Sequence, residues 1–149
     1  MRKSKTINII VICAILFILN SCTIKEQKAK FLPLPATEHG VKAWDIIINV
    51  AIEHYQGVEY TDKKEGIIKS LPKITDTCWA GLLYGGFVPC ESERFIARVW
   101  TLSPFKADIA VQRHKATSVS SYQEWIEDGN NLGKEKELYE ELVSKLSSI

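Results

Sequence analysis

The sequence predicts an α+β domain: an antiparallel sheet of about four strands, with an N-terminal and a C-terminal helix packed on one of its faces. Segments near both ends of the domain repeat apolar residues at three- and four-residue spacing, the period of an amphipathic helix. Four segments between them are rich in β-branched and aromatic residues, which favour strands. Short polar turns join these segments in pairs, and short connections indicate antiparallel hairpins.

The first residues have the composition of an export signal. Arg2, Lys3 and Lys5 make a positively charged start, and residues 7–19 form an apolar run interrupted only by Asn8. This run has the length of the apolar part of a signal peptide. A membrane-spanning helix needs roughly 20 apolar residues, so the run is short for that role.

The apolar run ends at Leu19-Asn20-Ser21-Cys22, which resembles the lipobox of bacterial lipoproteins. The resemblance implies that residues 1–21 are a signal peptide and that the sulfur of Cys22 carries a diacylglycerol, which anchors the protein on a membrane. Thr23 stands where an aspartate often retains lipoproteins in the inner membrane. The resemblance therefore implies an outer-membrane lipoprotein facing the periplasm. The alternative is an uncleaved anchor helix with an incidental cysteine.

Removal of residues 1–21 would leave a nearly neutral chain of about one domain in size. These residues hold three of the 19 Lys and Arg and none of the 18 Asp and Glu, so the remaining side-chain charge is −2. Domains that bind nucleic acid normally carry a basic patch or stripe. The composition therefore predicts no nucleic-acid partner.

Residues 22–40 are predicted to be a lipidated tether, and residues 41–149 a single domain. The tether has no periodic apolar face, and its two prolines disfavour a helix. The two predicted helices cover about residues 38–56 and 134–147. Their apolar positions are Val41, Trp44, Ile47, Ile48, Ala51, Ile52 and Tyr55 in the first helix, and Leu138, Leu142, Val143 and Leu146 in the second.

Two hairpins are predicted between the helices. Residues 58–60 and 66–71 form the first, around a polar turn that ends in a glycine. Residues 94–102 and 106–114 form the second, with Ser103-Pro104 at the turn.

Residues 73–92 are predicted to be a loop insertion between the hairpins, because they contain three glycines and a proline. Cys78 and Cys90 are the two cysteines left after Cys13 in the signal and Cys22, and an even pair in an exported protein predicts a disulfide. The insertion is apolar for a loop, so it either folds over the core or is an exposed protein contact. Its candidate contact residues are Trp79, Tyr84 and Phe87.

The stretch from residue 43 to 71 resembles the start of domains in the NlpB/BamC type of outer-membrane lipoprotein. The likeness lies in Ala43-Trp44-Asp45 before an apolar helix, and in Val58-Glu59-Tyr60 before the polar turn. It implies a helix-grip-like fold and a non-enzymatic domain that contacts another envelope protein. The Cys78/Cys90 insertion departs from the family pattern.

Arg94, Arg98 and Trp100 share one face of a predicted strand. Arginine and aromatic residues are enriched at binding hot spots, so Arg98 and Trp100 are candidates for protein contact. The alternative is structural: the arginine stems cover the edge of the core while their charged heads reach water.

An enzymatic alternative rests on Cys78-Trp79-Ala80. This run resembles the segment at the nucleophile of papain-like cysteine peptidases, in which a distant histidine activates the thiol; His114 would take that role in a cysteine hydrolase. The glutamine and glycines that such families place before the nucleophile are absent. His39 and His54 are not close to each other or to His114 at zinc-ligand spacing, and no motif predicts a metal or a cofactor.

Overall fold

Two long antiparallel strands, β5 (Phe87–Leu102) and β6 (Phe105–Ala116), form the centre of the fold. The computed structural model describes residues 28–80, 85–117 and 124–149. The other elements are β1 (Leu32–Pro33), α2 (Gly40–Tyr55), β2 (Val58–Asp62), β3 (Ile67–Ser70), β4 (Lys73–Trp79), β7 (Trp125–Asn130) and α3 (Leu132–Leu146). The predicted α+β class with an antiparallel sheet is confirmed, but the described sheet has seven strands rather than about four.

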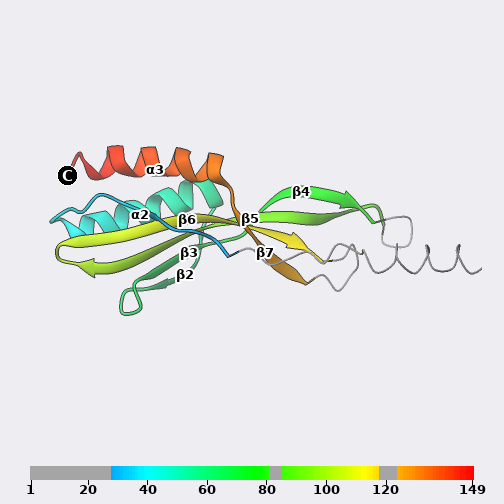
Figure 1. Ribbon diagram of the computed structural model, residues 1–149, viewed down its shortest axis with the longest axis horizontal. Coiled ribbons are helices and arrows are strands. Elements are labelled where there is room, and N and C mark those ends of the chain that lie inside the picture. Colours follow the sequence, from blue (N-terminus) through cyan, green and yellow to red (C-terminus); the bar gives the residue numbers. More distant parts are fainter. Residues whose placement is uncertain (1–27, 81–84, 118–123) are drawn as a thin grey trace, which may run out of the picture.

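The sheet has two parts, which we call the body and the arm. In the body the strand order is β1-β6-β5-β3-β2. The arm contains the outer halves of β5 and β6, with β4 paired to β5 and β7 paired to β6. Both helices lie on the same side of the body, and the arm projects beyond their ends (Figure 1).

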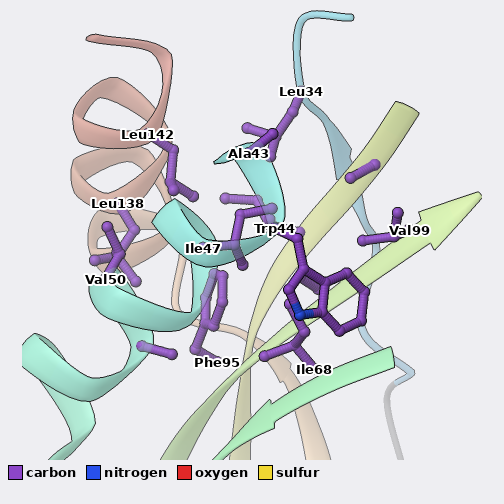
Figure 2. Close-up of a cluster of buried hydrophobic side chains, with 14 of the residues drawn as sticks. Leu34, Ala43, Trp44, Ile47, Val50, Ile68, Phe95, Val99, Leu138 and Leu142 are labelled. Carbon is purple, nitrogen blue, oxygen red and sulfur yellow. The ribbon is translucent and has the colours of Figure 1, made fainter. Parts of the chain in front are cut away.

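Side chains alternate between the two faces of β5 and β6, and one set forms the core. Phe95 and Val99 of β5 point to the helices, where they join Trp44 and Ile47 of α2 and Leu138 of α3 in one buried cluster (Figure 2). The helices therefore cover one face of the sheet with their apolar sides. The other face carries no helix among the described residues.

A buried polar contact joins the arm to the body. Glu93 of β5 is buried and accepts hydrogen bonds from the Tyr55 hydroxyl at 3.4 Å and from Asn131 Nδ2 at 2.7 Å. Asn131 is also the N-cap of α3, because its Oδ1 accepts a hydrogen bond from the backbone N–H of Lys134 at 3.2 Å. Burial and the nearby Glu93 carboxylate raise the pKa of Tyr55 far above its usual range. These bonds fix the ends of both helices against the base of the arm.

The described part of the predicted tether is paired with the sheet. Leu32 and Pro33 form β1 opposite Ile109 and Asp108 of β6, and the backbone N–H of Leu34 donates to the carbonyl of Ala107 at 2.8 Å. Pro33, one of the two prolines that indicated a tether, is tolerated because β1 is an edge strand, where a missing N–H costs little, and Pro35 follows the strand. The predicted tether over 22–40 is therefore wrong for its last residues. Residues 1–27 lie outside the described residues.

Most of the described residues in the predicted loop insertion over 73–92 are strand: they form β4 and the start of β5. β4 pairs along its length with the outer part of β5. The register shifts next to the Thr77–Pro89 pair, and bulges are among the places where a strand accepts proline. Among the described residues, the pairing of β5 with β6 ends at Glu91, so Pro89 interrupts no described ladder bond on that side. The described glycines and the proline, which predicted a loop insertion, therefore belong to a hairpin of two strands with a bulge.

Candidate functional site: the uncovered face of the sheet

The face of the sheet opposite the helices, which we call the open face, brings together side chains from five strands. The alternation along β5 and β6 and the strand register place its members. They are Tyr60 of β2, Ile74 of β4, Arg94, Arg98 and Trp100 of β5, His114 of β6 and Trp125 of β7.

Arg98 and Trp100 form a rigid cluster at the body end of the open face. The guanidinium of Arg98 makes two hydrogen bonds to Asp108, at 2.9 and 2.8 Å, and it lies 3.5 Å above the ring of Phe31 and 5.1 Å from that of Trp100. Trp100 Nε1 donates to the same carboxylate at 3.3 Å, yet the residue is 64% exposed. The charge of Arg98 is therefore matched within the chain, while Trp100 offers a fixed apolar surface to solvent.

A hollow of about 250 Å³ lies at the base of the arm on the open face. Pro72, Ile74 and Trp125 give it apolar walls, and Arg94 and His114 give it a polar side. The Nη1 atom of Arg94 donates to Glu59 at 3.0 Å, whereas its buried Nε has no hydrogen-bond partner in the described residues. The hollow thus combines apolar walls with a polar side that includes the guanidinium-bearing Arg94.

His114 makes stability depend on pH. Burial lowers its pKa below the ordinary value of 6.5, and the neighbouring Arg94 guanidinium lowers that pKa further, against a smaller raising effect of Glu127. Since the unfolded chain then binds a proton more readily than the folded one, His114 destabilises the fold as the pH drops below about 6.5. We expect His114→Gln to lose less stability than the parent between about pH 7.5 and 5 in urea titrations. His39→Gln, at an exposed position, is the matched control for the removal of a histidine.

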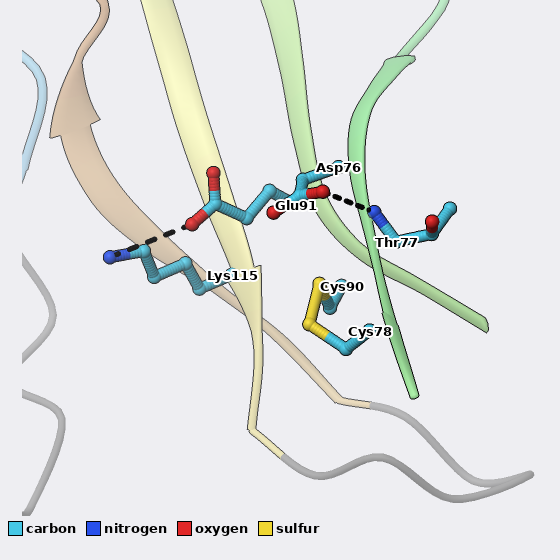
Figure 3. The surroundings of a disulfide bond; sticks show 6 residues. All are labelled: Asp76, Thr77, Cys78, Cys90, Glu91 and Lys115. Carbon is cyan, nitrogen blue, oxygen red and sulfur yellow. Dashed lines mark hydrogen bonds and ion pairs between the residues drawn. A yellow bond between two sulfur atoms is a disulfide. The ribbon is translucent and has the colours of Figure 1, made fainter. Parts of the chain in front are cut away.

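The predicted disulfide between Cys78 and Cys90 is confirmed. It links β4 to β5 near the end of the arm, and charged side chains such as Glu91 and Lys115 lie toward the base (Figure 3). A sulfur in a disulfide is not a thiolate and cannot attack a carbonyl. The hydrolase alternative would therefore require a reduced Cys78 with His114 as its base.

The remaining predicted contact residues are split between two places. Trp79 and Phe87 face each other across the end of the β4–β5 hairpin, far from Trp100, which is near the other end of β5. Tyr84 and the lipidation residue Cys22 lie outside the described residues. The five predicted contact residues are therefore not one surface.

Ile74, His114 and Trp125 were missed as members of one site. Their common face follows from the pairing of β4 and β7 with the central hairpin, and neither strand was predicted. The alternation Asp108, Ala110, Gln112, His114 along β6 was the only signal, and it does not reveal which strands lie beside it.

The described parts of the chain contain neither a membrane-spanning helix nor a cluster of metal ligands. No helix there has the length and apolar character needed to cross a membrane. No three His, Cys, Asp or Glu side chains in those parts converge as metal ligands. Comparison with protein-family models, with curated proteins and with solved structures finds no match to this chain.

Proposed function

We propose that the chain is a lipid-anchored lipoprotein of the bacterial envelope, on the periplasmic side of the outer membrane, and that its domain binds another envelope protein through the open face. It acts by contact and not by catalysis. The observation that carries the protein-binding part is the open face itself. Aromatic side chains from separate strands are exposed there, on the side of the sheet without helices, and one of them, Trp125, lines a hollow.

The chemistry of the open face supports a protein partner. Exposed aromatic residues and arginines are typical of binding hot spots, and the open face carries both. Trp100 is held by its hydrogen bond to Asp108, so little side-chain entropy is lost when it is covered. The hollow beside Ile74 and Trp125 accepts an apolar side chain, and Arg94 recognises an acceptor next to it. Two helices on one face of an antiparallel sheet also agree with the helix-grip resemblance, which implies an envelope adaptor.

The lipid anchor is supported by the sequence of residues 1–22. We expect the protein extracted from bacterial membranes to lack residues 1–21 and to carry a mass increment of a diacylglycerol on Cys22. Cys22→Ser should abolish both changes, because the sulfur is the acceptor. Intact-mass spectrometry of the two proteins checks this. A parent protein that keeps residues 1–21 would instead be held by an uncleaved helix.

Site-specific photo-crosslinking tests the binding face. We expect a photoreactive phenylalanine analogue in place of Trp100 to give a discrete crosslinked protein in intact cells. The matched control is the same analogue in place of Val41, which is 66% exposed on α2 on the opposite side of the sheet. Equal products from both positions, or none from Trp100, would contradict binding through the open face.

A further inference from the structure

We infer that the tip of the arm touches the membrane surface, with the rings of Trp79 and Phe87 lying among lipid headgroups. This inference rests on the lipid anchor proposed above. It concerns a different surface from the open face, and it assigns the bilayer itself as the occupant of that surface.

Trp79 and Phe87 form a preorganised apolar pair. They are 57% and 70% exposed, and their rings meet edge to face with centroids 5.2 Å apart. The disulfide begins at the neighbouring Cys78, and the backbone N–H of Ala80 donates to the carbonyl of Gly86 at 2.8 Å. Because the hairpin is closed twice at this point, little conformational entropy remains to be lost when the rings are buried.

The charge pattern of the tip suits the interfacial zone of a bilayer. No residue from Cys78 to Cys90 is charged in the sequence. The nearest charged side chains of the described strands, Asp76 and Glu91, lie further toward the base of the arm. Insertion of the rings therefore requires no charge to leave water. Tryptophan is enriched at membrane–water interfaces, where its ring is apolar and its N–H finds a polar partner.

The start of the described chain runs beside the arm. The backbone N–H of Lys30 donates to Asn130 at 2.8 Å, and that of Ala29 donates to Glu127. Asn130 ends β7 opposite Gln112 of β6, whereas Glu127 pairs with His114, further out along the arm. Followed toward its N-terminus, the chain therefore heads along the arm, away from both helices.

The distances agree with a common membrane plane. Lys28 is the sixth residue after Cys22, so the chain between them can span at most about 22 Å. β4 has seven residues, so it extends about 23 Å from the base of the arm to the tip. Because so few residues join the lipid on Cys22 to the domain, the arm stays close to the bilayer. The tip of the arm is then within reach of the membrane surface. The acyl chains supply the affinity, and the rings fix the orientation of the domain.

Fluorescence quenching by brominated lipids tests the inference. The full-length lipidated protein is prepared with Trp100→Phe and Trp125→Phe, which leaves Trp79 and the buried Trp44, and is reconstituted in phosphatidylcholine–phosphatidylglycerol vesicles. Bromine near the top of the acyl chains should remove most of the Trp79 emission. Addition of Trp79→Ala should leave only the unquenched emission of Trp44. The Phe87→Ala variant should reduce the quenching of Trp79.

The outcomes separate the inference from the proposed function. Protein that floats with the vesicles but shows no quenching of Trp79 would overturn the contact of the tip and leave the lipid anchor standing. Equal quenching after Trp79→Ala would overturn it as well. A mass that shows no lipid on Cys22 removes the proposed anchor and the inference with it. Unquenched Trp79 with a sedimentation coefficient that falls in Trp79→Ala would instead assign the tip to a second copy of the chain.

Discussion

Replacing Ile47 by alanine is expected to lower the free energy of unfolding by about 3 to 4 kcal/mol. Ile47 is fully buried in α2 and belongs to the cluster that joins both helices to the sheet. The substitution removes the transfer free energy of three carbon atoms. It also leaves a cavity whose walls belong to a helix and a sheet that cannot both move in. Urea denaturation monitored by tryptophan fluorescence measures the loss.

The same helix offers a matched control. Ile52 is the same residue type in α2, but it is 46% exposed. Ile52→Ala should change the free energy of unfolding by less than about 1 kcal/mol, because little buried surface is lost and alanine favours the helix. Similar losses for Ile47→Ala and Ile52→Ala would mean that the packed side of α2 has been assigned incorrectly.

The comparison of these two residues shows how far periodicity determines a helix. Three- and four-residue spacing predicted α2 and placed Trp44 and Ile47 in the core, which is confirmed. It also placed Val41 and Ile52 on the buried side, and both are exposed. Val50, which the pattern omitted, is fully buried. Apolar residues surround much of this helix, so the angle that faces the sheet is decided by packing and not by the sequence of the helix alone.

The central hairpin was predictable because its information is local. Ser103-Pro104 separates two β-rich runs, and β5 and β6 meet there. The edges of the sheet were not predictable, because β1 and β7 are short, polar or proline-containing and form only by pairing with β6. Side chains of such strands can line one site, as Trp125 and His114 do, although no periodic pattern in the sequence predicts that they lie together.

Loss of the Cys78–Cys90 disulfide is expected to lower the free energy of unfolding by about 3 kcal/mol, which the chain-entropy model gives for a loop of this length. The bond restrains the unfolded chain, and in the folded chain it holds β4 on β5. The Cys78→Ala/Cys90→Ala double variant avoids a free thiol that would form new bonds. Urea denaturation of this variant, beside the parent with and without reductant, measures the effect.

Which parts of the domain are destabilised when the disulfide is removed depends on how firmly the arm is joined to the body. Glu93 lies on the arm side of β5, yet its bonds go to Tyr55 and Asn131 at the ends of the two helices. Opening the arm would leave this buried carboxylate exposed to water and deprive the N-cap of α3 of one partner. We therefore expect hydrogen exchange in the double variant to accelerate at amides of both β4 and the body, such as Ile68. Faster exchange confined to β4 would mean that the arm opens by itself, and that the disulfide serves the orientation of Trp79 more than the stability of the domain.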